Sequence, residues 1–308
     1  MSCDVDKPTV SFVVPVFNSS EQAKKLAARL TGFSNIDKCE IIFVDDGSTD
    51  ALVSSSLPES IKLVSLQVNR GRAIARNEGI NKCTGEYIHF LDVDCIPADD
   101  YITKLLEQTA KSIDVVFGHL EFQCDDIFYQ NFENDNQLVR AKGECNWELV
   151  QSSACLLVKK DLVLAIEGFS KKFNRYGFED RDFLIRLKQR FPNASFAYVK
   201  ALTVYHKDEL TLDSFLSKFY ASGKYSAPIL RKAHPIAYSQ SAYAKVDVNT
   251  SNIFSKIPKF LQMLFITITT PVLKGIFHLS PDTAKLKVLT FKALKGLAFL
   301  KGTINEGK

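Results

Sequence analysis

GEYIHFLDVD, residues 85–94, is an apolar run that ends in two aspartates, Asp92 and Asp94. Apolar runs of this length, rich in aromatic and β-branched residues, predict a buried strand. Two carboxylates two positions apart on an extended chain point to the same side, where they can hold a hard divalent cation. An Asp-x-Asp pair alone is common, but one that ends an apolar strand indicates a ligand site at the carboxyl edge of a sheet.

Outward from this stretch, residues 9–120 alternate strand-like and helix-like segments. The strands are expected at Thr9–Val16, Glu40–Val44, Ile61–Leu66, Glu86–Leu91 and Ile113–Phe117, and the helices at Glu21–Leu30, Gly71–Asn81 and Tyr101–Lys111. Such alternation predicts an α/β fold with a mostly parallel, doubly wound central sheet flanked by helices. Ligands of such sheets bind where the strands end.

The remaining chain divides less clearly. Residues 121–148 are polar and weakly periodic, and we interpret them as a long excursion. Strands around 154–158 and 194–205 and helices at 179–190 and 212–227 follow. A boundary is expected near 230–252, where prolines and a Ser/Asn-rich stretch occur. We therefore predict a catalytic domain over 1–230, with halves at about 1–120 and 121–230, then a linker and helical tail over 231–308.

Two polar clusters end the first two strands. Pro15-Val16-Phe17-Asn18 follows the first strand, and Val44-Asp45-Asp46-Gly47-Ser48-Thr49-Asp50 ends the second. An acidic pair before Gly and Ser forms a tight turn, and its carboxylates can accept hydrogen bonds from a base or ribose. Alone, the acidic pair is more often a capped turn; after Pro-Val-Phe-Asn, a binding site is favoured.

Three further clusters carry charge. Arg72 and Arg76 share a helix face at i, i+4 spacing and can approach a diphosphate, although a solvated surface helix would show the same pattern. Glu179 and Asp180 begin a predicted helix, where acidic residues usually act as caps; the functional interpretation makes Asp180 a general base. His206 ends a strand and is either structural or a metal ligand.

Charge and cysteine content exclude several classes of protein. Residues 253–308 hold nine lysines against Asp282 and Glu306, a net charge of +7, whereas residues 1–252 carry 30 basic and 33 acidic side chains. This distribution argues against nucleic-acid binding and suggests that the tail meets an anionic membrane surface. Seven cysteines without a C-x-x-C pair indicate neither a disulfide frame nor a zinc site. Without a secretory leader pattern, we expect a cytoplasmic protein.

The tail contains two apolar segments. Residues 260–273 are uncharged, and at about 1.5 Å per residue a helix of this length falls short of the ~30 Å hydrocarbon core. Because Pro271 should also interrupt it, we expect the segment to lie on a bilayer, on the inner face of the cell membrane, rather than cross it. Residues 283–301 are moderately amphipathic, with Lys287 among the apolar positions. The alternative is packing on the core or on a second subunit in a homodimer.

In this order, the six clusters resemble the family 2 glycosyltransferases of the GT-A fold, a Rossmann-like nucleotide-binding fold, over about residues 9–230. The resemblance implies a nucleotide-sugar site that includes Arg72 and Arg76, with the nucleoside held by Pro15, Phe17, Asn18, Asp45 and Asp46. Asp92 and Asp94 would contact ribose and a diphosphate-bound Mn²⁺ or Mg²⁺, with Asp94 the usual ligand and His206 completing the shell. Asp180 would be the catalytic base and Glu179 would lie near a sugar.

This resemblance implies inverting transfer of a hexose or N-acetylhexosamine to a hydroxyl of a glycan or lipid-linked glycan, in bacterial surface polysaccharide synthesis. Transfer to a polyprenyl phosphate and an inactive nucleotide-sugar-binding scaffold are the alternatives. A processive synthase would carry Gln-x-x-Arg-Trp, but the only tryptophan is Trp147. The G-x-G-x-x-G of dehydrogenases and the Gly-Lys-Ser/Thr of P-loop NTPases are also missing.

Overall fold

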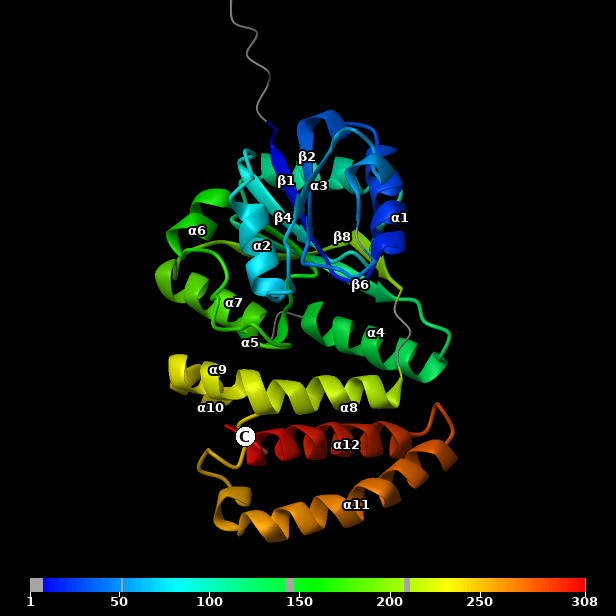
Figure 1. Ribbon diagram of the computed structural model, residues 1–308, viewed down its shortest axis with the longest axis vertical. Coiled ribbons are helices and arrows are strands. Elements are labelled where there is room, and N and C mark those ends of the chain that lie inside the picture. The colour runs from blue at the N-terminus through cyan, green and yellow to red at the C-terminus, as the bar shows by residue number, and fades with distance from the viewer. Residues whose placement is uncertain (1–7, 51, 142–146, 208–210, 308) are drawn as a thin grey trace, which may run out of the picture.

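A computed structural model describes residues 8–50, 52–141, 147–207 and 211–307 (Figure 1). Its centre is an eight-stranded sheet in the order β3-β2-β1-β4-β7-β6-β8-β5. The strands are β1 Val10–Val16, β2 Cys39–Asp45, β3 Ile61–Ser65, β4 Tyr87–Leu91, β5 Cys95–Pro97, β6 Val115–Phe122, β7 Cys155–Lys159 and β8 Phe196–His206. Four of the seven pairings among the described strands are parallel, which confirms a mostly parallel sheet.

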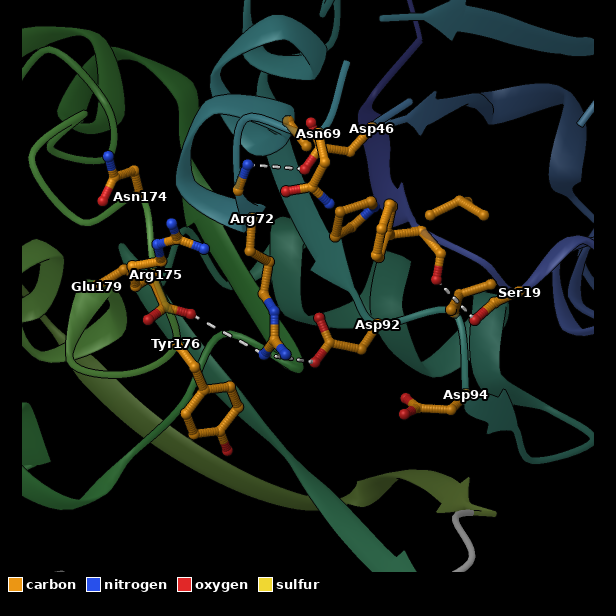
Figure 2. Close-up of a pocket in the computed structure, with 16 residues that line it drawn as sticks. Ser19, Asp46, Asn69, Arg72, Asp92, Asp94, Asn174, Arg175, Tyr176 and Glu179 are labelled. Carbon is orange, nitrogen blue, oxygen red and sulfur yellow. Dashed lines mark hydrogen bonds and ion pairs between the residues drawn. The ribbon is translucent and has the colours of Figure 1, made fainter. Parts of the chain in front are cut away.

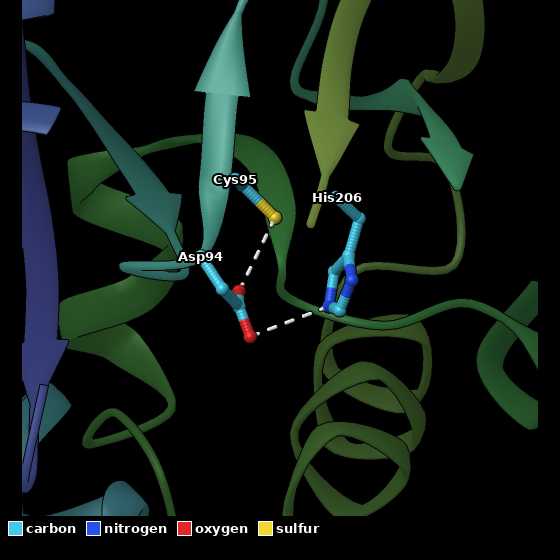
Figure 3. Close-up of side chains that lie close together, drawn as sticks. All are labelled: Asp94, Cys95 and His206. Atoms are coloured by element: carbon cyan, nitrogen blue, oxygen red, sulfur yellow. Dashed lines mark hydrogen bonds and ion pairs between the residues drawn. The ribbon is translucent and has the colours of Figure 1, made fainter. Parts of the chain in front are cut away.

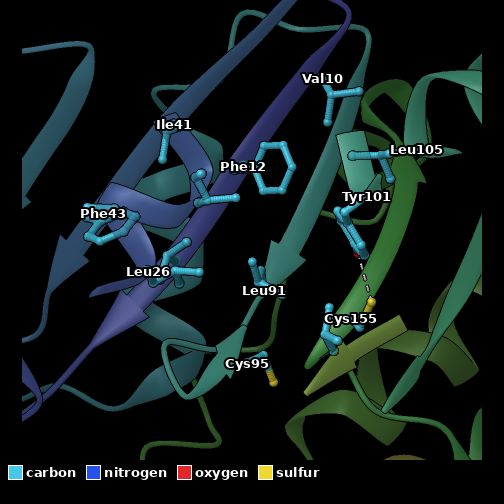
Figure 4. Packing of buried hydrophobic residues seen from close by; sticks show 14 of the residues in the cluster. Val10, Phe12, Leu26, Ile41, Phe43, Leu91, Cys95, Tyr101, Leu105 and Cys155 are labelled. Atoms are coloured by element: carbon cyan, nitrogen blue, oxygen red, sulfur yellow. Dashed lines mark hydrogen bonds between the residues drawn. The ribbon is translucent and has the colours of Figure 1, made fainter. Parts of the chain in front are cut away.

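The first half of the sheet is the parallel unit β3-β2-β1-β4, as the alternating sequence pattern predicted. Helices cover both of its faces, so neighbouring residues on one strand are both buried. Phe12 packs in a cluster with α1 (Ser20–Thr31) and α3 (Tyr101–Ala110), as Figure 4 shows in part, whereas Val13 packs in a second cluster with α2 (Arg72–Ile80). Burial on both faces explains why the inner strands β1, β2 and β4 are mostly apolar rather than alternating.

The second half of the sheet is mixed. β7 runs antiparallel to both β4 and β6, and the short β5 runs antiparallel to β8. The segment interpreted as an excursion contains α4 (Ile127–Ala141), and residues 142–146 lie outside the described part of the chain. α5 (Trp147–Val150), α6 (Lys160–Ala165) and α7 (Glu179–Arg190) follow. The predicted bounds of α7 are confirmed.

A layer of helices lies below the sheet in Figure 1. It starts with α8 (Leu212–Ala221), which continues through a π-helical turn at Ser222–Ser226 into α9 (Ala227–Ala233); α10 (Pro235–Gln240), α11 (Lys259–Leu279) and α12 (Lys285–Ile304) follow. α12 lies between α8 and α11. A side-chain carbon added at Gly302 of α12 would lie 2.3 Å from the Tyr220 carbonyl oxygen, so only glycine permits this close approach.

The basic tail is packed onto the rest of the protein. Phe277 and Phe291 of the tail share one apolar cluster with Phe128 of α4. The Glu306 carboxylate accepts two hydrogen bonds from Nη2 of Arg231, at 2.9 and 2.8 Å. In the sequence analysis, packing on the core was an alternative to membrane contact for the tail. For α12, this alternative is the one that the structure shows.

The expectation that Pro271 would interrupt the first tail segment is wrong. α11 is one helix of 21 residues with Pro271 inside it. A proline leaves the carbonyl of the residue four positions earlier without its helical partner. That residue is Thr267, and both residues are exposed, so water can solvate the carbonyl. By length and composition alone, α11 is the one described helix that could cross a membrane, with a mean hydropathy of 1.5.

The structure shows the surroundings of Lys287 and of five of the seven cysteines. Lys287 lies among apolar side chains, as predicted: it is buried, it pairs with Asp282, and its ammonium lies 4.8 Å from the Phe277 ring centroid. The described cysteines are free thiols, namely Cys39, Cys83, Cys95, Cys124 and Cys155. Cys3 and Cys145 lie outside the described residues.

Candidate active site

Two adjoining cavities lie at the carboxyl edge of the sheet. The first, of about 420 Å³, is bounded by the ends of β1, β2 and β4 and by the start of α2 (Figure 2). The second, of about 320 Å³, lies between the sheet and α8. Five residues line both cavities: Arg72, Asp92, Asp94, Tyr176 and Glu179. The predicted donor-side and acceptor-side carboxylates therefore meet in one place.

Two of the residues predicted to contact the nucleoside, Asn18 and Asp45, instead stabilise the loops around the first cavity. The Asn18 amide oxygen accepts a hydrogen bond from the Thr49 amide at 2.9 Å, and so joins the loops after β1 and β2. The Asp45 carboxylate accepts the amides of Ser48 and Leu52 at 3.0 and 3.3 Å. Neither residue lines the cavity, so the geometry of Asp45 is that of the capped turn weighed in the sequence analysis. Pro15 and Phe17 do line it.

Asp46 lines the first cavity and also fixes the start of α2. Its two carboxylate oxygens accept the backbone amides of Arg70 and Gly71, each at 2.8 Å. Gly71 caps α2 with φ +93°, a conformation that a side chain would strain. Burial raises the pKa of Asp46, despite the two amide donors. Both carboxylate oxygens of Asp46 already accept a hydrogen bond, so a ligand can contact Asp46 only from the side that faces the cavity.

The Asp-x-Asp pair lies in a turn, so the expectation of an extended chain is wrong. β4 ends at Leu91, and the Cys95 amide donates to the Asp92 carbonyl at 3.0 Å. The turn separates the two carboxylates. The Asp92 carboxylate lies beside the Arg72 guanidinium in Figure 2 and also pairs with Arg76, whereas the Asp94 carboxylate pairs with His206 at the end of β8, as Figure 3 shows. The two aspartates therefore have different partners.

Arg76 lies beneath the cavities rather than in them. Its side chain is 1% exposed and lines neither cavity, unlike that of Arg72, which is 44% exposed and lines both. Its Nη2 lies 2.9 Å from Oδ1 of Asp92, and its Nη1 lies 3.2 Å from Oδ1 of Asp180 and 3.5 Å from Oε1 of Glu179. One buried guanidinium thus joins Asp92 to both Glu179 and Asp180.

The electrostatics of this cluster follow from its burial and its arginines. Burial alone would raise the pKa of Asp92, but Arg76 and Arg72 outweigh it and lower that pKa. Burial, followed by the neighbouring Asp180, raises the pKa of Glu179, and the same two arginines only partly offset the rise. Burial also raises the pKa of Tyr176 to about 12, so this phenol is neutral at physiological pH.

Glu179 and Asp180 are placed by an unusual start to α7. The preceding residues, Gly177 and Phe178, both have positive φ, +101° and +68°. A side-chain carbon at Gly177 would lie 2.4 Å from Oγ of Ser222 in the π-helical turn, so the two segments touch here. A non-glycine residue in the left-handed region is strained, and such strain often occurs at functional sites.

Asp180 is held by one oxygen. Its Oδ1 accepts hydrogen bonds from Oγ of the buried Ser153 at 2.5 Å and from Nη1 of Arg76 at 3.2 Å. Within the described part of the chain, Oδ2 has no hydrogen-bond partner, and Asp180 lines the second cavity. A carboxylate fixed by one oxygen with the other one free has the geometry of a positioned proton acceptor.

The residues that could hold a metal ion are Asp94 and His206. Oδ2 of Asp94 lies 3.4 Å from Nε2 of His206 (Figure 3). Asp94 also lines both cavities. A carboxylate oxygen and an imidazole nitrogen suit Mn²⁺, with phosphate oxygens as further ligands. Cys95 lies close to both, but burial and the adjacent aspartates keep its pKa well above the usual range, so it stays a thiol. Asp92 fits a metal less well, because Arg72 and Arg76 already pair with both oxygens of its carboxylate.

Several cavity residues had no role in the sequence analysis. Asn174 and Arg175 line the first cavity, and Tyr176, which lines both, lies under the Arg72 guanidinium at 5.5 Å. These residues immediately precede the Glu-Asp cluster, so proximity in sequence was an available signal. Gln137 of α4 lines the second cavity, and the buried Ser153 hydrogen-bonds Asp180 from behind the cavity wall. Both come from stretches without a recognisable pattern, and only the fold brings them here.

Comparisons with known proteins agree on one family and one fold. The family model described as "Glycosyl transferase family 2" matches residues 11–166, which are 156 of the chain's 308 residues. The chain is similar to the glycosyltransferase AglE of Haloferax volcanii, with 30% identity over 174 residues, covering 53% of this chain and 56% of AglE. It is also similar to a poly-β-1,6-N-acetyl-D-glucosamine synthase of Staphylococcus epidermidis, with 33% identity over 107 residues, covering 33% of this chain and 26% of the synthase.

Among solved structures, the chain is similar to the mannosyltransferase PcManGT of Pyrobaculum calidifontis, which was solved in complex with GDP-Man and Mn²⁺. The TM-score is 0.59 at 16% sequence identity, and the similarity covers 96% of this chain and 87% of the other. This likeness, with the mixed sheet and its flanking helices, confirms the expected GT-A type α/β fold. The chain spans about half or less of the length of the two sequence relatives.

Proposed function

The chain belongs to glycosyl transferase family 2, and we propose that it transfers a hexose or N-acetylhexosamine from a nucleotide-sugar, of which a UDP-sugar is the first candidate. The acceptor is a hydroxyl of a glycan or lipid-linked glycan, and the reaction inverts the anomeric centre and depends on Mn²⁺ or Mg²⁺. The observation that carries the proposal is the meeting of the Asp92–Asp94 turn and the Glu179–Asp180 pair between two cavities, joined by Arg76.

The first cavity suits the donor. Pro15 and Phe17 would contact the nucleoside, and Arg72, with 44% of its side chain exposed at the junction of the cavities, would pair with the diphosphate. Asp94 and His206 would hold the divalent ion, which when bound supplies positive charge for the diphosphate leaving group. The Mn²⁺ and GDP-Man bound by the structurally similar mannosyltransferase support this assignment.

The second cavity suits the acceptor. Oδ2 of Asp180 would take the proton of the acceptor hydroxyl as the hydroxyl oxygen attacks the anomeric carbon. The bond from that carbon to the diphosphate oxygen breaks, and the nucleoside diphosphate leaves with the bonding electrons. Attack from the side opposite the leaving group inverts the configuration. Arg76 would act as a positioning residue, because it holds Oδ1 of Asp180 and leaves Oδ2 free.

Charge favours a hydroxyl over a phosphate acceptor. The second cavity is lined by five acidic side chains, from Asp92, Asp94, Glu133, Glu179 and Asp180, and by three basic side chains, from Arg72, Arg181 and Lys218. An anionic polyprenyl phosphate would enter a site with no excess of positive charge, and it would need no base at Asp180. An inactive scaffold would be expected to lack one of the metal or base residues, yet Asp94, Asp180 and His206 are all present.

We propose further that the protein lies on the inner face of the cell membrane through its tail, as suits enzymes of bacterial surface polysaccharide synthesis. α11 exposes a row of apolar side chains: Phe260, Leu264, Phe265, Ile268 and Val272 are each at least half exposed. Lys256 and Lys259 are exposed beside its start. An apolar helix face with basic residues matches an anionic lipid surface. A homodimer that buries the same face is the competing arrangement.

A donor screen tests the proposed activity. We expect one UDP-, GDP- or dTDP-sugar to release its nucleoside diphosphate, by transfer or slow hydrolysis, with Mn²⁺ but not with EDTA. Asp94→Ala should lower that release by a factor on the order of 10³, as removal of transition-state charge stabilisation does. Asp161→Ala, which changes an exposed aspartate on α6 away from both cavities, is the matched control. Absence of binding and release with every donor, in folded protein, would instead favour the scaffold.

A further inference from the structure

The second cavity has an unusual wall residue on α4. Gln137 is fully buried, and neither its amide nitrogen nor its amide oxygen has a hydrogen-bond partner among the described residues. Buried side-chain amides in native proteins are nearly always hydrogen-bonded, because each unpaired donor or acceptor has lost its water. An amide with both functions unpaired, in the wall of a cavity, therefore points to a ligand that supplies a donor and an acceptor together.

The position of Gln137 follows from the helical repeat. Tyr129, Glu133 and Gln137 are spaced four residues apart, so they lie along one face of α4. The first of them packs with Phe291 of α12, whereas Glu133 and Gln137 both line the second cavity. The apolar end of this face fixes the helix on the tail layer, and the polar end faces the place where the acceptor is proposed to bind.

The surroundings of Gln137 match a carbohydrate rather than a charged or wholly apolar ligand. The same cavity is lined by the rings of Phe215 and Phe219 on α8 and by Tyr243, whose ring stacks on that of Phe219 at 6.3 Å. Flat apolar rings beside a few polar groups favour a ligand with both apolar C–H faces and hydroxyls. A side-chain amide donates from nitrogen and accepts at oxygen, so it can bind two neighbouring hydroxyls at once.

We propose that Gln137 binds two adjacent hydroxyls of a pyranose ring in the acceptor and thereby determines which sugar is glycosylated. This inference rests on the proposed glycosyltransferase function, since the ring would present a further hydroxyl to Asp180, which lines the same cavity. Gln137 is a specificity-determining residue in this assignment. It contacts the acceptor but takes no part in proton transfer.

Initial rates on p-nitrophenyl pyranosides test the proposal. The panel contains the glucose, galactose, mannose, N-acetylglucosamine and N-acetylgalactosamine glycosides, and the full chain is used with the donor found by the screen. Gln137→Leu should raise KM for the preferred glycoside about tenfold or more, because an unpaired hydroxyl loses a buried hydrogen bond, while KM for the donor stays constant. Gln137→Glu, which keeps the oxygen acceptor but not the donor, should change the ranking of the panel.

Gln108→Leu is the matched control. Gln108 is buried on α3, lines neither cavity and donates to the Lys104 carbonyl at 3.1 Å, so its loss should leave the acceptor KM unchanged. Thermal unfolding of all three variants shows whether each one is folded. Unchanged acceptor KM in Gln137→Leu would mean that Gln137 is satisfied by water or packing, and would overturn the inference while leaving the transferase intact.

Binding of the glycosides separates this inference from the proposed function. If no donor is turned over, the transferase proposal fails, and ligand-observed NMR of the same glycosides then decides the role of Gln137. Binding by wild type that is lost in Gln137→Leu would support the sugar site. A wild-type protein that neither binds nor glycosylates any member of the panel would overturn it.

Discussion

The two cavities are built in different ways. Apart from the stretch 174–179, the first is lined by residues between positions 15 and 94, which lie at strand ends or at the start of α2. The second gathers side chains from residue 72 to residue 243, including several from α4 and α8. The family match ends at residue 166, before Glu179 and Asp180. The first cavity is thus a local product of the sheet, and the second cavity is a product of helix packing.

The polar groups also differ between the cavities. Around the first cavity, Asn18, Asp45 and Asp46 are already satisfied by backbone amides, so their loops are fixed before a ligand binds. In the second, Gln137 and one oxygen of Asp180 have no described partner. The comparison teaches that the first cavity is preorganised, whereas the second leaves Gln137 and one Asp180 oxygen available to a ligand.

The largest expected effect separates the base from donor binding. Asp180→Asn should lower transfer to a hydroxyl acceptor by roughly 10²–10⁴-fold, because the amide cannot take the proton. KM for the donor should change little, since Asp180 lines only the second cavity. Steady-state kinetics with donor and acceptor varied in turn measure both quantities. Retained transfer to the hydroxyl acceptor would show that Asp180 is not the base, and activity of the variant with a polyprenyl phosphate alone would favour that acceptor.

A second substitution should affect both cavities. Arg76→Lys keeps the positive charge, but one ammonium cannot span Asp92 and Asp180 as the guanidinium does. We expect kcat to fall about 10²-fold through misplacement of both carboxylates. Arg29→Lys, which alters an arginine paired with the exposed Asp99, is the control. A change in only one substrate's KM, with kcat intact, would contradict the bridging role.

Glu40 on β2 stabilises the part of the sheet that carries the first cavity. Glu40 on β2 accepts hydrogen bonds from Oγ of Ser11 at 2.5 Å and from the Thr84 amide and hydroxyl, and it pairs with Lys62 at 2.7 Å. Burial opposes ionisation, but these partners lower its pKa from 4.5 to about 2. Glu40→Gln should lower the free energy of unfolding at pH 7 by about 1–3 kcal/mol.

The pH dependence of that effect has a definite sign. Because the folded-state pKa is the lower one, the stabilisation from ionised Glu40 is present above pH 4.5 and is lost as the pH falls toward 2. Urea unfolding at pH 7, 4 and 2.5 should therefore show wild type and Glu40→Gln converging in acid. A gap that stays constant with pH would show that the carboxylate charge is not what stabilises the sheet.

The smallest expected effect lies outside both cavities. Lys256→Ser with Lys259→Ser should weaken binding to phosphatidylserine vesicles by roughly thirtyfold, since each basic residue contributes about 1 kcal/mol at an anionic surface and about 1.4 kcal/mol is tenfold. Kinetics with soluble substrates should not change, because neither lysine lines a cavity. Co-sedimentation measures the binding. Failure of wild type itself to sediment, with dimers in solution, would assign the apolar face of α11 to a second subunit.

Sequence prediction succeeded where the periodic pattern was strong. The parallel unit β1–β4 with its helices, α7, and the ending of β8 at His206 were all expected. The extended Asp-x-Asp pair and the interruption at Pro271 were wrong, since a turn separates the two aspartates and solvent can satisfy the carbonyl that the proline orphans. α4 was missed because its buried face mixes aromatic side chains with Glu133 and Gln137.

By itself, the sequence determined the fold class, the edge of the sheet at which the two cavities lie, and the residue types gathered there. Strand ends in a parallel sheet converge whatever the side chains are, so motifs that follow those strands can be placed without coordinates. The tertiary structure alone decided that Arg76 is buried between three carboxylates, that Asp180 keeps one oxygen free, and that Gln137 faces the second cavity. These contacts join residues up to 104 positions apart, and no local spacing encodes them.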